Sequence, residues 1–140
     1  MLYVDTSVLV AAMTNEPRTD EMQEWLAGQE AGQLAVSDWV MTEFSAALSV
    51  KLRTGQLEPA HRADAMAVFA ELVEASFQVL PVSSLDFHTA GRFADQYTTG
   101  LRAGDALHLA VAYNHGARVR TLDQTLVTAA GALGVSAELL

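Results

Sequence analysis

Short apolar strand candidates alternate with helical segments along the whole chain, and this alternation constrains the fold more than any other feature. The strand candidates cover residues 2–4, 34–36, 77–82 and 117–121, with a last short segment from Val135 onward. Strands that alternate with helices form a mainly parallel sheet with helices on both faces. The sequence therefore predicts a three-layer α/β/α domain with a short, mainly parallel central sheet flanked by helices.

Glycine, proline and capping residues set the bounds of the expected helices. Pro59 favours a helix start, because proline fits the first helical position, and Gly55 favours a stop just before it. Thr6 or Ser7 is expected to cap the first helix. Helices are expected over residues 7–13, 18–31, 38–53, 59–76, 84–100, 103–114 and 122–133.

Length and composition narrow the class of protein. A chain of 140 residues is the size of one ordinary domain, so residues 1–140 are expected to fold as a single unit. The longest apolar runs fall short of the roughly 20 residues that cross a bilayer, and no basic and then apolar leader opens the chain. We therefore expect no membrane partner and a cytoplasmic location.

The composition also limits the kind of metal that the chain can bind. The sequence contains no cysteine, which excludes disulfides and thiolate metal sites. Oxygen ligands and four histidines remain, and they favour Mg²⁺ or Mn²⁺ over structural zinc. The formal net charge is −9, which taken alone argues against nucleic-acid binding and is also explained by solubility.

Two acidic residues directly follow predicted strands. Asp5 ends the segment MLYVD, and Asp123 ends RVRTLD, so each lies between a short strand and a helix. In open α/β sheets, ligands bind in the crevice beyond the carboxyl ends of the strands. Capping of the following helix explains either residue equally well. Both are therefore candidate ligand-binding residues with a structural alternative.

Two further acids lie on predicted helices that are otherwise apolar. Glu43 belongs to an inward stripe with Val40, Ala47 and Val50, where an unpaired carboxylate costs several kcal/mol. An arginine partner is its structural alternative. Asp105 stands in the first turn of LRAGDALHLAVAY, where the helix dipole also favours an acid.

Together these four acids predict a metal site. Like charges a few ångströms apart repel by about 1 to 4 kcal/mol per pair, and a divalent cation offsets that repulsion. An all-oxygen site suits Mg²⁺ or Mn²⁺, which can activate water and stabilise a leaving oxygen at phosphorus. The chemistry indicated is phosphodiester hydrolysis.

Other polar residues near these acids are candidates for supporting roles. The hydroxyls of Ser7 and Thr121 are placed to orient a carboxylate, although turn hydrogen bonds explain them equally well. Phosphate contacts are assigned to Arg102, Arg118 and Arg120, for which a solvated surface position is the alternative. The histidines show no paired metal-ligand spacing. His108 is expected to be a core or surface residue, and a position near the crevice, one turn after Asp105, is the alternative.

The order of these motifs resembles the PIN-domain nucleases, and specifically the bacterial VapC-type toxins of toxin–antitoxin pairs. The resemblance rests on DTSVLV, the inward Glu43, LRAGDALHLA and TLDQTLVTAA, and it covers essentially the whole chain. It implies that Asp5, Glu43, Asp105 and Asp123 form the acidic set, with Ser7 at the small hydroxyl position. It also implies Mg²⁺- or Mn²⁺-dependent endoribonuclease activity on RNA, homodimerisation, and inhibition by a cognate antitoxin.

Other functional classes fit the sequence less well. Receiver domains pair a strand-end acid with a lysine at another strand end, whereas Lys51, the sole lysine, lies within a predicted helix. Haloacid-type phosphatases need an Asp-x-Asp pair, and this chain has Asp5-Thr6-Ser7. A PIN-like module that binds RNA or protein without cutting is the non-enzymatic alternative, and metal binding separates it from the nuclease.

Overall fold

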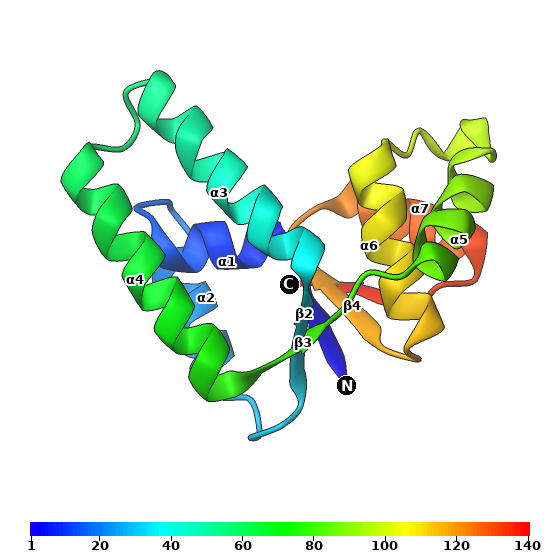
Figure 1. Cartoon of the computed structure of the whole chain (residues 1–140), viewed down its shortest axis with the longest axis horizontal. Helices are drawn as coiled ribbons and strands as arrows, with labels where there is room; N and C mark the ends of the chain where they lie inside the picture. The colour runs from blue at the N-terminus through cyan, green and yellow to red at the C-terminus, as the bar shows by residue number, and fades with distance from the viewer.

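A five-stranded sheet organises the chain in a computed structural model that describes residues 1–140 (Figure 1). All neighbouring strands are parallel, in the order β3-β2-β1-β4-β5. The strands are β1 (Leu2–Val4), β2 (Leu34–Ser37), β3 (Phe77–Leu80), β4 (Arg118–Thr121) and β5 (Ala137–Leu139). The predicted α/β class with a parallel central sheet is confirmed.

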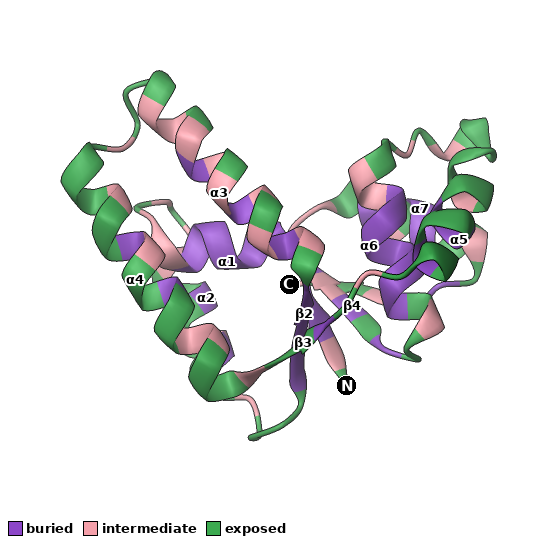
Figure 2. Ribbon diagram, viewed as in Figure 1, coloured by how far each residue is buried: buried purple, intermediate pink, exposed green.

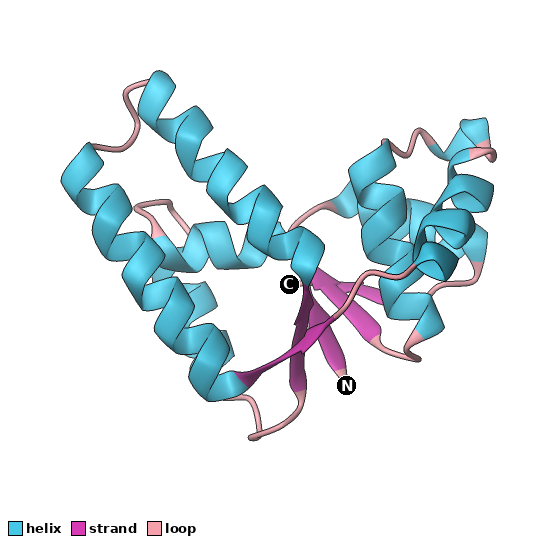
Figure 3. Cartoon of the chain, in the orientation of Figure 1, coloured by secondary structure: helices cyan, strands magenta, loops and turns pink.

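Seven helices flank the sheet, with α1 to α4 on one side and α5 to α7 on the other (Figure 3). They are α1 (Thr6–Met13), α2 (Thr19–Ala27), α3 (Asp38–Arg53), α4 (Pro59–Ser76), α5 (Ser84–Ala94), α6 (Ala103–Asn114) and α7 (Gln124–Leu133). A short 3-10 turn, η1 (Tyr97–Thr99), precedes α6. None of the helices combines the length and apolar character that a bilayer span requires.

Two helices end earlier in the structure than the sequence predicts. Helix α2 ends at Ala27 with Gly28 as its C-cap, four residues before the predicted end, because glycine is a poor helix former. Helix α5 ends at Ala94, and the chain continues through η1 to Gly100, whose φ of 70° closes that turn. The positive φ at Gly100 reverses the chain so that α6 can pack against α5.

The predicted inward stripe of α3 is partly wrong. Val40, Phe44 and Leu48 are fully buried, whereas Val50 is 45% exposed. Phe44 stacks on Phe69 of α4 with ring centroids 4.0 Å apart, so the i, i+4 row faces the neighbouring helix. Glu43 lies at the edge of this buried face and is half-buried. Figure 2 shows the same division, with buried residues concentrated on the central strands β1 and β2 and on the inner sides of α1, α3 and α6.

The strand order creates a switch point between β1 and β4. From β1 the chain moves through β2 to β3 at one edge, then crosses to β4 and ends at β5 on the other edge. The connections after β1 and β4 therefore leave the sheet toward opposite faces, which opens a crevice at their carboxyl ends. The Asp5 amide donates to the Arg120 carbonyl at 3.0 Å, so the residues after β1 lie directly beside those after β4.

Helix α6 is anchored to α5 by one buried carboxylate. Asp86 is 1% exposed, and its Oδ2 accepts hydrogen bonds from the Ser83 amide at 2.9 Å and the Ser83 hydroxyl at 3.1 Å. Its Oδ1 accepts one from Asn114 Nδ2, at the end of α6, at 2.7 Å. Burial acts to raise the pKa of Asp86, but the hydrogen bonds from Ser83 and Asn114 outweigh it and hold the pKa below its usual value.

The substitution Asp86→Asn is expected to lower the free energy of unfolding at pH 7 by about 1–3 kcal/mol, because buried donors lose their acceptor. A depressed folded pKa stabilises the protein above the unfolded value of about 3.9 and loses that contribution as pH falls through the folded pKa. The difference in the free energy of unfolding between the wild type and Asp86→Asn should therefore be largest above about pH 5 and should decrease below about pH 4. Urea unfolding across this pH range measures the difference, and Asp95→Asn serves as the exposed control. A difference that does not change with pH would contradict a lowered pKa of Asp86 in the folded protein.

Candidate functional site

The four acids singled out by the sequence line one open pocket at the carboxyl ends of β1 and β4. Asp5 comes from the β1–α1 junction, Glu43 from α3, Asp105 from α6, and Asp123 from the β4–α7 junction. Thr6, Ser7 and Glu16 complete its polar lining, and Leu122 with small side chains of α3 supplies an apolar part. Residues that are up to 118 positions apart in the sequence therefore share one surface.

Asp5 is held by two hydroxyl groups. Its side chain is 9% exposed, and its Oδ2 accepts hydrogen bonds from Ser7 Oγ and Thr121 Oγ1, each at 2.7 Å. Asp5 occupies the N-cap position of α1 but makes no side-chain capping bond. The interpretation of Asp5 as a helix cap is therefore wrong, and so is the prediction that Thr6 or Ser7 caps α1. Both side chains instead donate to carboxylates of the pocket.

Glu43 is paired with a histidine. Its Oε1 accepts a hydrogen bond from Thr6 Oγ1 at 2.7 Å and a short one from His108 Nε2. Burial acts to raise the pKa of Glu43, but these two donors outweigh it and leave the pKa below the usual value. Glu43 therefore has a structural partner, as the alternative interpretation expected, but this partner is His108 rather than an arginine.

His108 is the residue whose role the sequence analysis underestimated. It is 1% exposed on α6, and its Nδ1 lies 2.7 Å from Tyr3 Oη, which lies 2.7 Å from Ser37 Oγ. Burial acts to lower the pKa of His108, but Glu43 and Asp5 outweigh it and raise the pKa above its usual value. The one available signal was spacing, because His108 follows Asp105 by three positions and so shares its helix face.

Three side chains come close enough to hold one ion. Ligand atoms of Asp5, Glu43 and His108 all lie within 4.8 Å of one another. The two carboxylates of this set offer oxygen ligands, which suit a hard divalent cation, whereas His108 Nε2 is already hydrogen-bonded to Glu43. The chemistry of the donors therefore fits the predicted class of metal.

Asp105 and Asp123 face the same pocket with different environments. Burial raises the pKa of Asp105 above its usual value, and the negative charges of Asp123 and Asp5 add to this effect. Asp123 Oδ1 caps α7 by accepting hydrogen bonds from the amides of Thr125 at 2.9 Å and Leu126 at 3.3 Å. Asp123 therefore caps α7 through Oδ1, as the structural alternative expected, while its Oδ2 accepts no hydrogen bond.

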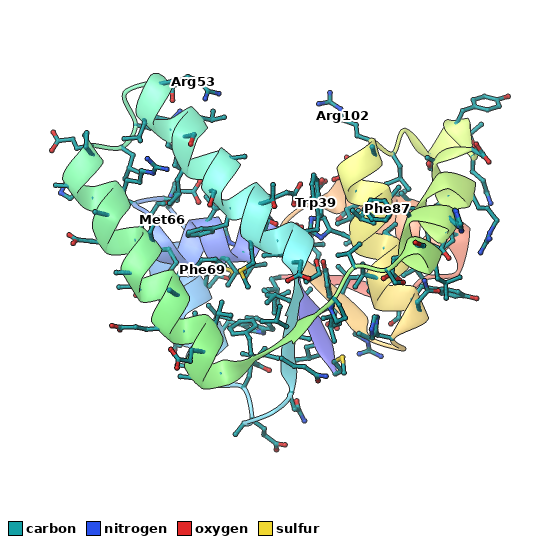
Figure 4. All side chains as sticks on the ribbon, in the orientation of Figure 1. Trp39, Arg53, Met66, Phe69, Phe87 and Arg102 are labelled. Atoms are coloured by element: carbon teal, nitrogen blue, oxygen red, sulfur yellow. The ribbon has the colours of Figure 1, made fainter.

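The three arginines assigned to phosphate contacts lie in different places. Arg102 precedes α6 and projects away from the sheet into solvent (Figure 4). Arg118 pairs with Leu2 at the amino end of β4 and lies 3.6 Å from Glu138. Arg120 Nη1 lies 2.6 Å from Glu138, and its guanidinium stands 5.4 Å from the Trp25 ring centroid. Neither Arg118 nor Arg120 lines the acidic pocket, so the structure gives no support to an RNA contact by these two residues.

Comparison with known proteins finds similarity in both sequence and structure. The family model described as PIN domain matches residues 2–132. A VapC ribonuclease of Rhizobium meliloti is 32% identical over 127 residues, which cover 83% of this chain and 89% of that protein.

Solved structures share the fold. VapC20 of Mycobacterium tuberculosis, described as a sarcin-ricin loop cleaving toxin, has a TM-score of 0.73 at 20% identity and covers 96% of both chains. VapBC2 of Rickettsia felis, solved with a DNA fragment from its promoter, has a TM-score of 0.68 at 16% identity, over 100% of this chain and 99% of that one.

Gly104 keeps the wall of the pocket close to Glu43. A Cβ atom at position 104 would stand 3.2 Å from Glu43 Oε2 and 3.2 Å from Trp39 Cζ2. Trp39 lies between α3 and α6 in Figure 4, so both neighbours are held by packing. By contrast, a Cβ at Gly91, in the middle of α5, would meet nothing within 4 Å.

The two glycines should therefore respond oppositely to alanine. We expect Gly91→Ala to raise the free energy of unfolding by about 0.5–1 kcal/mol, because alanine loses less entropy in a helix. Gly104→Ala should lower it by about 1 kcal/mol or more, since crowding displaces Glu43 or Trp39. Urea unfolding measures both, and an equal gain in the two variants would refute the close contact.

Proposed function

Because the chain belongs to the PIN-domain family and is a VapC-type member of it, we propose that it is a divalent-metal-dependent endoribonuclease that hydrolyses phosphodiester bonds of RNA. The observation that carries this proposal is the pocket shared by Asp5, Glu43, Asp105 and Asp123. A surface that only binds RNA gains nothing from concentrated negative charge, whereas a metal-dependent nuclease requires it.

We assign the metal to the four carboxylates, with Mg²⁺ or Mn²⁺ as the ion. When bound, such an ion supplies positive charge at the scissile phosphate and activates water for attack at phosphorus. It also answers the objection from the net charge of −9, because the local charge at the pocket becomes favourable for a phosphate. Arg102, which is exposed at the start of α6, stays the candidate for contact with a flanking phosphate.

The chain's own residues prepare the carboxylates for this role. Ser7 and Thr121 donate hydrogen bonds to Asp5 Oδ2, and the backbone at the N-terminus of α7 donates one to Asp123 Oδ1. Each acid is thereby oriented through its protein-facing oxygen, which leaves the other oxygen for an ion. Ordered donors of this kind reduce the cost of arranging ligands when the ion binds.

In the cell we propose that the protein is the toxin of a toxin–antitoxin pair. The similarity to a VapC ribonuclease supports this role. A cognate antitoxin would cover the pocket, and its basic DNA-binding part would complement the acidic surface of this chain. A homodimer and a cytoplasmic location are part of the same proposal.

Purified protein should cut total bacterial RNA at discrete positions in Mg²⁺ or Mn²⁺, with no cleavage in EDTA. Asp5→Asn should slow cleavage by about 100-fold or more, because it replaces a metal ligand. Asp95→Asn removes an exposed acid outside the pocket and should cut like the wild type. Mapping of cut ends by sequencing measures the effect, and cleavage that survives EDTA or Asp5→Asn would refute the mechanism.

Production of the protein without an antitoxin should arrest bacterial growth. Asp105→Asn should relieve the arrest, whereas Asp20→Asn, on the exposed surface of α2, should not. Growth curves with matched amounts of soluble protein decide between these outcomes. Normal growth with abundant wild-type protein would exclude the toxin role while leaving the nuclease activity to the RNA assay.

A further inference from the structure

A buried chain of hydrogen bonds runs behind the acidic pocket. Ser37 Oγ lies 2.7 Å from Tyr3 Oη, Tyr3 Oη lies 2.7 Å from His108 Nδ1, and His108 Nε2 bonds Glu43. Ser37 and Tyr3 are fully buried, and His108 is 1% exposed. These three side chains cannot touch an RNA substrate, so any role in the reaction must pass through the acids.

The hydrogen-bond partners of His108 determine which of its ring nitrogens carries a proton. Nε2 lies between Glu43 Oε1 and Asp5 Oδ1, which is 3.4 Å away. Both oxygens belong to carboxylates, which only accept hydrogen bonds when ionised. Nε2 therefore carries a proton and donates it to Glu43, with Asp5 Oδ1 lying 3.4 Å away. The phenol of Tyr3 holds the opposite nitrogen, so the ring is fixed at both ends.

The hydrogen bond from His108 helps to determine which carboxylate oxygens remain free to bind an ion. Glu43 Oε1 is occupied by His108 and Thr6, which leaves Oε2 on the side of Gly104. Asp5 Oδ2 is occupied by Ser7 and Thr121. A donor between two like charges offsets their repulsion, which is strong where the oxygens lie within 4.8 Å of each other in a partly buried site. Without it, Glu43 and Asp5 would turn away from each other.

Stability alone does not account for such an arrangement. Replacing buried ionic groups with apolar side chains of similar volume is often neutral or stabilising. The Tyr3–His108–Glu43 chain therefore serves the geometry of the pocket better than it serves the free energy of folding.

We propose that His108 is a positioning residue, which holds Glu43 and Asp5 in the arrangement that binds the divalent ion, and that Tyr3 fixes the orientation of His108. This inference rests on the metal-dependent function proposed above. It extends that function to two buried residues that bind neither the ion nor the RNA.

Mn²⁺ affinity measured by calorimetry on the full chain tests the proposal apart from catalysis. His108→Leu keeps much of the volume and removes the donor, so the affinity should fall about tenfold or more. His108→Gln places an amide nitrogen near the position of Nε2 and should stay within about threefold of the wild type. Tyr3→Phe removes the hydroxyl that bonds His108 Nδ1, so the imidazole ring is no longer fixed in orientation. We expect Mn²⁺ binding to weaken about threefold or more.

A matched control separates this role from loss of stability. Val111→Ala opens a cavity one turn beyond His108 in the same helix, at a buried residue that does not line the pocket, and should leave Mn²⁺ affinity unchanged although it lowers stability. In RNA cleavage, His108→Leu should lower kcat and leave KM for RNA nearly unchanged, since His108 does not contact the substrate.

Three outcomes would overturn the proposal. Wild-type Mn²⁺ affinity in both His108→Leu and Tyr3→Phe would show that the hydrogen-bond chain does not position the acids. An equal loss in Val111→Ala would assign the effect to stability. A directly bonded imidazole nitrogen in the electron spin echo spectrum of bound Mn²⁺ would make His108 a ligand. Absence of Mn²⁺ binding by the wild type itself would instead refute the metal-dependent function, and the role of His108 with it.

Discussion

Repulsion between carboxylates gathered at one end of the sheet is the constraint on which the rest of the structure depends. Asp5, Glu43, Asp105 and Asp123 line one pocket, and a buried or half-buried acid must find donors or a cation. The hydroxyls of Ser7, Thr6 and Thr121 supply donors to Asp5 and Glu43. Backbone amides at the start of α7 supply donors to Asp123. The fold thus satisfies the inner oxygens and leaves the outer ones without partners.

The architecture positions each of these donors. Parallel pairing of β1 with β4 places Thr121 beside Asp5, because the two residues follow adjacent strands at the switch point. Packing of α6 against α5, secured by the contact of Asn114 with Asp86, fixes the helix that carries His108. Gly104 allows α6 to approach α3 closely enough for His108 to reach Glu43. The site is therefore a consequence of helix and strand packing rather than of one loop.

The positive charges of the chain relieve only the rim of the pocket, where Lys51 pairs with Glu16. Arg18 and Arg120 are each paired with a glutamate outside the pocket, and Arg120 also lies over Trp25. The only basic side chain paired with any of the four acids is His108, which is buried behind the pocket and contacts Asp5 and Glu43. An external cation is thus the simplest means of compensating the exposed side of the pocket, in agreement with a nuclease that uses a metal ion to bind phosphate.

The sequence by itself determined the element order, the parallel α/β class and the positions of the acids beside the strand ends. These features depend on periodicity, capping and turn residues within a few positions, which a linear pattern records. Only the tertiary structure decided that Ser7 and Thr121 share one oxygen of Asp5, that α3 turns Val50 outward, and that His108 joins Glu43. The hydrogen bonds that define the pocket join pairs of residues that are separated by 37, 65 and 116 positions in the sequence. Partners at such separations are chosen by helix rotation, strand order and close packing, and no local pattern encodes these.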